Sequence, residues 1–142
     1  MANRRSDIID AFTSQLQQIN SVESRNVYSS YRWIDELNDY PAITYVPRRE
    51  ARVHRGDGRK LAAIIIELRG YVYDGDGSEA IAAAETLASE IEDKVDTFAA
   101  SAREHAVESA VVVSVRTDEG LMHPYGVCDL TINITYDVEI TT

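Results

Sequence analysis

VCDLTINITYDVEI, at residues 127–140, alternates apolar and polar side chains almost without a break. Successive side chains of a β-strand point to opposite faces, so this stretch predicts a long strand with one buried face and one wet face. Such a strand is typical of an antiparallel sheet that helices cover on one side. The apolar set is Cys128, Leu130, Ile132, Ile134, Tyr136, Val138 and Ile140, and the polar set is Asp129, Thr131, Asn133, Thr135, Asp137 and Glu139.

Three further segments have the composition of strands. Residues 61–73 open with apolar side chains on both faces, which predicts a central strand that is covered on two sides. Residues 42–46 lie between Pro41 and Pro47, so we expect an edge strand or the start of a strand there. Residues 106–117 contain a run of β-branched valines and predict another strand.

Two segments have helical periodicity. Apolar residues at spacings of three and four predict an amphipathic helix at residues 6–20, with Ser6 as its N-cap. The same spacing predicts a second helix at residues 78–99, with Ser78 as its N-cap. Residues 21–40 fit neither period and predict a short strand or loop followed by one helical turn.

The predicted order is helix, strand, strand, helix, strand, strand. It indicates an α+β fold with a mixed, largely antiparallel sheet of about four strands, two main helices packed on one face and long projecting hairpins. The strand at residues 127–140 would extend about 46 Å and the helix at residues 78–99 about 33 Å. The strands therefore outrun their helices, and exposed strand ends are usually paired or blunted, which favours an oligomer.

The size and composition fit a single domain at residues 1–142. A chain of 142 residues with 44% hydrophobic residues can bury one core without disulfides or a structural metal. The lone thiol of Cys128 excludes an internal disulfide, and three scattered histidines give no zinc pattern, so we expect a reducing, cytoplasmic setting. The longest apolar run, residues 61–66, is far shorter than the about 20 residues of a membrane-spanning helix, so no membrane partner is expected.

Charge is distributed unevenly along the chain. Six of the 14 basic residues but only two of the 24 acidic residues fall in residues 48–60, which leaves a balance of −14 elsewhere within a net charge of −10. The overall charge opposes general binding to nucleic-acid phosphates. A turn signal at residues 56–58 predicts that the segment forms a loop or a projecting basic hairpin. Its basic residues are Arg48, Arg49, Arg52, Arg55, Arg59 and Lys60.

Three roles are open for this basic segment. It could be a solvated hairpin, or a docking arm for an acidic neighbour, which could be another copy of the chain. Contact with DNA is the third role, although the segment lacks the interleaved aromatic residues that stack on single strands. If it is a docking arm, the variants Arg52→Glu or Arg55→Glu should impair assembly while the subunit stays folded.

No motif indicates a catalytic, cofactor-binding or metal site. Residues 74–77 resemble the start of a calcium loop, but the sixth position is Glu79 instead of glycine, so a strand-to-helix turn is the better interpretation. His105 and His123 have no nucleophile motif near them, and the acids of residues 127–140 are not placed in a cleft. We therefore expect no enzymatic activity and no cofactor; an enzyme whose cleft forms only between subunits is the weaker alternative.

Five features follow one another in a recognisable order: an N-terminal amphipathic helix, a strand at residues 41–46, a charged hairpin, a long apolar strand before a helix, and a closing strand at residues 126–136. Across residues 6–140 this order resembles the tail terminator, or tail completion, proteins of tailed phages. The resemblance implies a subunit that forms a ring, commonly a hexamer, on the end of the tail tube. It also implies that the ring stops tube polymerisation, offers a joining surface to the head connector protein, and belongs to the virion after assembly in the host cytoplasm.

In such a ring the wet face of the last strand could line the channel. Asp129, Asp137 and Glu139 would then be channel-facing acids, and DNA would pass without sticking because like charge removes the attraction for phosphates. Two alternatives remain open. One is a head-closure or other neck protein, and the other is a nucleic-acid-binding accessory module that uses residues 48–60.

Overall fold

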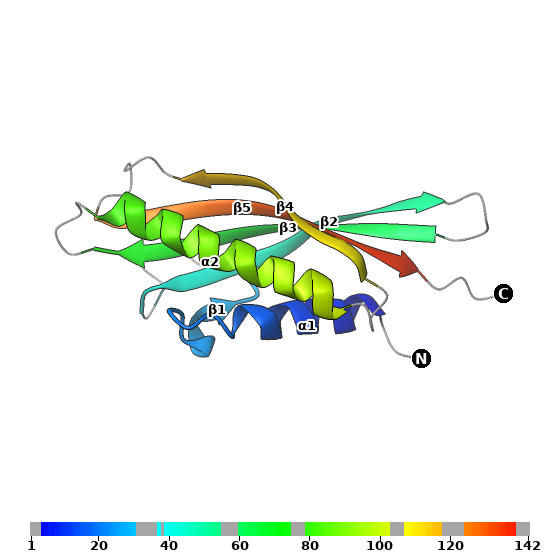
Figure 1. The fold of residues 1–142 in the computed structure, drawn as a ribbon, viewed down its shortest axis with the longest axis horizontal. Helices are drawn as coiled ribbons and strands as arrows, with labels where there is room; N and C mark the ends of the chain where they lie inside the picture. The colour runs from blue at the N-terminus through cyan, green and yellow to red at the C-terminus, as the bar shows by residue number, and fades with distance from the viewer. Residues whose placement is uncertain are drawn as a thin grey trace.

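The computed structural model describes residues 4–30, 37, 39–54, 60–74, 79–102, 107–117 and 124–138. They form one elongated sheet with both helices packed against the same face (Figure 1), which confirms the predicted α+β fold. In chain order the elements are α1 (Arg4–Leu16), a 3-10 turn η1 (Ser24–Asn26), β1 (Val27–Tyr28), β2 (Ala42–His54), β3 (Lys60–Tyr73), α2 (Ala80–Ser101), β4 (Val107–Thr117) and β5 (Tyr125–Val138).

Among the described residues, the strands are ordered β1-β2-β3-β5-β4 across the sheet. β1 runs parallel to β2, and the other neighbouring pairs are antiparallel. The mixed, largely antiparallel sheet is confirmed, but it has five strands instead of about four. The additional strand is β1, whose two residues are too few to leave a period in the sequence.

The larger of two buried clusters lies between the helices and one face of the sheet, which we call the covered face. β3 shows the separation, because Ala62 and Ile64 are fully buried while Ala63 and Ile65 beside them are only partly buried. The prediction that this strand is covered on two sides holds only near its end, where Tyr71 and Val72 are both buried. Along the rest of β3 it is wrong, since α1 and α2 lie on the same side. On the opposite, open face, Ala63 and Ile65 of β3 lie beside cross-strand neighbours. At the end of β3 the same face carries a second, smaller buried cluster of Leu37, Ala42, Tyr71 and Val127.

An aromatic contact joins the two helices to the sheet. The ring of Phe12 in α1 meets Tyr45 of β2 at 5.8 Å and Phe98 of α2 at 5.5 Å, both in edge-to-face geometry. Such pairs stabilise beyond the burial of their area by about 0.5–1.5 kcal/mol. The contact therefore fixes α1 over β2 and beside α2.

The helix ends differ from those predicted. α1 begins at Arg4, so Ser6 lies inside its first turn and is not the N-cap. It ends at Leu16, and the chain continues in tighter turns in which the Ile19 amide donates to the Leu16 carbonyl. Ile19 stays buried in these turns, which explains why the apolar period runs beyond the helix.

The start of α2 also differs from the prediction. The helix begins at Ala80, and Ser78, the predicted N-cap, lies outside the described residues. The carboxylate of Asp74 accepts a hydrogen bond of 2.7 Å from the backbone N–H of Glu79. A side chain from the end of the preceding strand thus satisfies an amide at the helix start.

β2 is longer than predicted and continues through Pro47 to His54. A register shift between Pro47 and Arg49 marks a β-bulge, after which β2 pairs regularly with β3 as far as the His54 and Lys60 pair. β1 pairs with the outer side of β2 at Ile43 and Thr44, and no other described strand pairs with that side, so the rest of β2 is an edge in the described structure. The end of this strand pair projects beyond both helices (Figure 1).

Residues 21–40 are described only in part. The 3-10 turn η1 comes before β1, whereas the sequence predicted a helical turn after the short strand. Residues 31–36 and 38 lie outside the described residues. The stretch ends in a cis peptide bond between Tyr40 and Pro41, where the chain enters β2.

Candidate assembly surfaces

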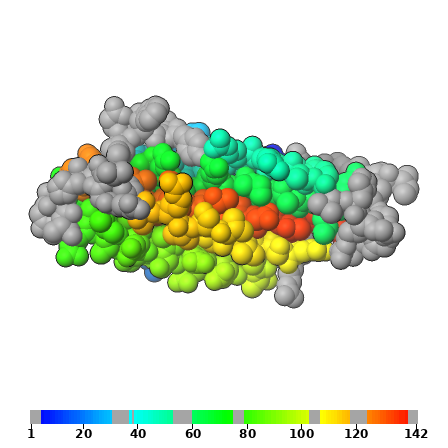
Figure 2. All heavy atoms as spheres, turned by 90° about the horizontal axis from the view of Figure 1, so that it is seen from above, coloured from blue at the N-terminus to red at the C-terminus, as the bar shows by residue number. Residues whose placement is uncertain are grey.

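The open face of the sheet is a surface that the described helices leave uncovered. Figure 2 shows this face, with β2, β3, β5 and β4 side by side and α2 visible beyond β4. The polar residues Asp129, Thr131, Asn133, Thr135 and Asp137 of β5 lie on it, as the alternation predicted. Glu139 lies outside the described residues.

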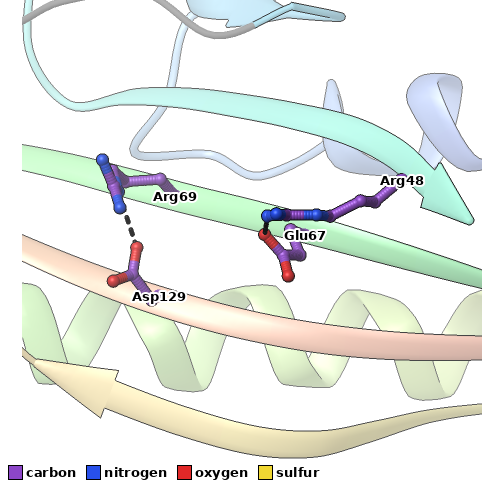
Figure 3. Close-up of polar contacts among 4 residues, drawn as sticks. All are labelled: Arg48, Glu67, Arg69 and Asp129. Carbon is purple, nitrogen blue, oxygen red and sulfur yellow. Dashed lines mark hydrogen bonds and ion pairs between the residues drawn. The ribbon is translucent and has the colours of Figure 1, made fainter.

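Ion pairs cross the strands of the open face. Arg69 of β3 donates from Nε to Oδ1 of Asp129 at 2.6 Å, and Arg48 donates from Nη1 to Oε2 of Glu67 at 2.5 Å (Figure 3). The hydrogen bond to Asp129 is the main reason why the pKa of Arg69 is raised above its usual range. Exposed pairs of this kind add at most about 1 kcal/mol of stability, so their main effect is to balance charge locally.

This balance bears on the predicted channel-facing acids. Asp129 is on the open face, but the charge of Arg69 offsets its own. Arg116 of β4 is paired in register with Asp129 and adds positive charge to the same region. Part of this region is a groove of about 250 Å³ lined by Arg69, Arg116, Asp129 and Glu67 among others. Its lining therefore mixes both signs of charge.

The predicted basic arm is divided between the two faces of the sheet. Arg48, at the bulge, reaches Glu67 on the open face, and Arg49 lies on the same face, opposite Ile65 and exposed. Arg52 lies on the covered side, where its Nη1 is 2.7 Å from Oε2 of Glu50. Lys60 is the half-buried first residue of β3. The remaining two residues of the predicted set, Arg55 and Arg59, lie outside the described residues.

Glu50 is the centre of a cluster that the sequence did not suggest. Its side chain is only 15% exposed, Arg5 of α1 lies 3.5 Å from it, and Tyr136 of β5 donates to it at 2.8 Å. Burial and this hydrogen bond raise the pKa of Tyr136 to about 12. Because the guanidinium groups of Arg5 and Arg52 share one carboxylate, the cluster keeps one positive charge near the β2 edge.

The opposite edge of the sheet has a different character. In the described part of the chain no strand pairs with the outer side of β4. Val111, Val113 and Val115 are 50%, 55% and 47% exposed on this strand. Natural edge strands usually carry charges or prolines that discourage pairing, so a row of valines on an edge is suited to a contact with another chain.

An acidic helix flank lies beside the β4 edge. α2 carries Glu85, Glu90, Glu92, Asp93 and Asp96 against the single cation Lys94. Glu90 accepts a hydrogen bond from Ser21 and so marks the flank of α2 that faces α1. Glu92 is turned about 200° from Glu90 in a helix, which places Glu85, Glu92 and Asp96 together on the flank toward β4.

The sequence matches one family of known proteins along nearly its whole length. That family is described as Bacteriophage Tail Tube Terminator Protein, and the match covers residues 3–141. The chain belongs to this family of phage tail tube terminators. No curated protein matches the sequence as a close relative.

A tail tube terminator is a structural protein of the phage tail, and this location makes it part of the virion. The resemblance seen in the sequence is thereby confirmed, and the terminator is favoured over the neck-protein and nucleic-acid-binding alternatives. Within the described residues of this terminator, no group of three potential metal ligands converges, and no helix is long and apolar enough to cross a membrane. The resemblance of residues 74–77 to a calcium loop falls mostly outside the described residues, but Asp74 is already used at the start of α2.

Proposed function

We propose that this tail tube terminator forms a ring, most simply a hexamer, on the end of the tail tube. The ring stops tube polymerisation and provides the joining surface for the head connector, and it is assembled in the host cytoplasm. The observation that carries this proposal concerns the two edges of the sheet, which lie on opposite sides of one subunit. In the described residues, β4 has no strand on its outer side and β2 has one only at Ile43 and Thr44. A contact between two different patches repeats from copy to copy and closes into a ring when its rotation closes.

We propose that the basic segment takes part in these contacts. Its end of the β2 and β3 pair projects beyond the helices, where another protein can reach it (Figure 1). Arg49 is exposed, and the cluster around Glu50 keeps one positive charge beside the same edge. Arg48, Arg52 and Lys60 lie on the flanking strands, and Arg55 and Arg59 are included because they lie between these strands in the sequence.

We further propose that the open face lines the channel, with Asp129, Asp137 and Glu139 turned toward passing DNA. No described helix covers this face, and β5 presents polar side chains along it. The pairing of Asp129 with Arg69 supports a lining of mixed charge. Such a lining offers DNA phosphates little net attraction, because binding to the phosphate backbone depends on uncompensated cations.

The test uses purified tail tube protein that polymerises in the presence or absence of the terminator. Electron microscopy should show shorter tubes with labelled terminator at one end, and capped tubes should bind purified head connectors. The variant Ile91→Asp, which places a charge at a fully buried position of α2, serves as the inactive control because it should not fold. Tubes of unchanged length with no terminator at their ends would refute the proposed function.

A further inference from the structure

We infer that the β4 edge of one subunit, together with the acidic flank of α2, receives the β2 edge of a second copy. One sheet would then continue into the next around the assembly. This inference rests on the proposed ring and adds the two surfaces that meet in it.

The directions of the strands fit this contact. The pairs β2 with β3, β3 with β5, and β5 with β4 are all antiparallel, so β2 and β4 of one subunit run in opposite directions. A second copy in the same orientation therefore presents its β2 antiparallel to β4, which is the pairing used across the rest of this sheet. On its outer side β2 has no described strand partner at residues 45–54, a stretch similar in length to β4 at Val107–Thr117.

The register identifies residues that would face each other. Arg49, Ile65, Asn133 and Val111 form one continuous row across the open face. The bulges of both strands lie outside two regular stretches, residues 49–54 of β2 and residues 109–112 of β4. A copy that continues the sheet without an offset along the strands places its Arg49 next to Val111, within these regular stretches.

Charge complementarity on the covered side also favours a second copy of the chain as the partner of the β4 edge. Across the sheet, the residues in register with Arg52 form a row that ends at Val107, the first residue of β4 after α2. The uncompensated positive charge shared by Arg5 and Arg52 would therefore approach Glu92 and Asp96 of the neighbouring α2. Opposite charge across a contact sets partner choice and register, and like charge at the wrong edge disfavours other pairings.

A cross-linking experiment tests the named contact in the presence of tail tubes. Variants Arg49→Cys and Val111→Cys are mixed and treated with a short bismaleimide, and covalent dimers are expected. The native Cys128 is fully buried and should stay unreactive in the folded protein. The matched control replaces Val111→Cys by Asp93→Cys, which is on the exposed side of α2 turned away from β4, and should give no dimers.

A second variant tests the charge contribution. The double reversal Glu92→Lys with Asp96→Lys should lower the yield of cross-linked dimers several-fold, whereas Asp93→Lys should leave it unchanged. Tubes that are capped while Arg49→Cys and Val111→Cys fail to cross-link would overturn this inference and leave the proposed function standing. Cross-linked dimers without capped tubes would support the contact between the two edges and refute the proposed function. Equal cross-linking of the Asp93→Cys control would also overturn the inference.

Discussion

The two faces of β3 and β5 share one backbone but differ in what surrounds them. On the covered face, Ile64 and Ile132 are completely buried beneath the helices. On the open face, Ile65 and Asn133 lie in register on neighbouring strands, and neither of the described helices lies on this face. The covered face therefore holds the larger of the two buried clusters, and the open face around Ile65 and Asn133, with its edges, is accessible to other proteins.

The strongest test of the difference between the two faces is to place the same charge at adjacent positions, one on each face. Ile64→Asp should unfold the subunit, because an unpaired carboxylate in the core costs about 4 kcal/mol or more. Ile65→Asp should leave it folded, with a loss of about 1 kcal/mol, because water can reach the open face. Circular dichroism during heating compares the two variants. Equal loss of structure in both would show that the open face is also part of the core.

The division into a covered and an open face could be predicted from the sequence, because apolar and polar residues alternate along the strand. In residues 127–140 every second side chain is apolar, and the structure places those side chains of β5 that it describes on the covered face. The period does not show how many faces of β3 the helices cover, because Ala63 and Ile65 are apolar although neither α1 nor α2 lies on their face. Composition at a position reports its preference for burial, whereas the placement of α1 and α2 depends on packing across the whole sheet.

Glycines at close contacts sharpen the comparison within the covered face. A Cβ atom at Gly126 would collide with the backbone carbonyl of Ala80, which cannot move without shifting the start of α2. A Cβ atom at Gly70 would instead lie 2.7 Å from Cδ2 of Leu87 and 2.8 Å from Sγ of Cys128, which are side-chain ends and not backbone. Gly126→Ala should therefore cost about 3 kcal/mol and Gly70→Ala about 1 kcal/mol of unfolding free energy. Urea denaturation of both variants measures the difference, and a reversed order would argue against close packing between β5 and α2.

The cluster around Glu50 lies where the covered face reaches solvent, and it makes that border sensitive to pH. The folded pKa of Tyr136, about 12, is above the ordinary value of 10.0, so its contribution to stability is complete below pH 10 and is lost as the pH rises toward 12. Tyr136→Phe should lower stability by about 1 kcal/mol at pH 8 through the lost hydrogen bond. The variant should also lose less stability than the parent protein between pH 10 and pH 12.

Thermal unfolding at several pH values checks this expectation. Tyr45 also has a raised pKa because of burial, so the parent protein loses stability in alkali for more than one reason. The difference between the parent protein and Tyr136→Phe isolates the contribution of Tyr136. An identical pH profile in both proteins would show that the bond between Tyr136 and Glu50 does not hold the phenol in its neutral form.

The partners at the assembly surfaces could not be predicted from the sequence, because they depend on strand register. Arg69 and Asp129 are 60 positions apart, and Tyr136 and Glu50 are 86 apart. Alternation alone would have separated Arg48 and Arg49 onto opposite faces. The bulge after Pro47 adds one residue to β2 and brings both to the open face, which no local pattern indicates.

The smallest expected effect belongs to the open face itself. Arg69→Ala removes the pair with Asp129, whose two side chains are 43% and 44% exposed, so the loss should be under about 1 kcal/mol and should shrink in high salt. Arg49→Ala, which removes an exposed arginine from the same face, should change stability even less. Urea midpoints at low and high salt measure both. If Arg69→Ala destabilised the subunit as strongly as a change in the core, the open face would be needed for folding, and its charges could not be assigned to contacts between proteins.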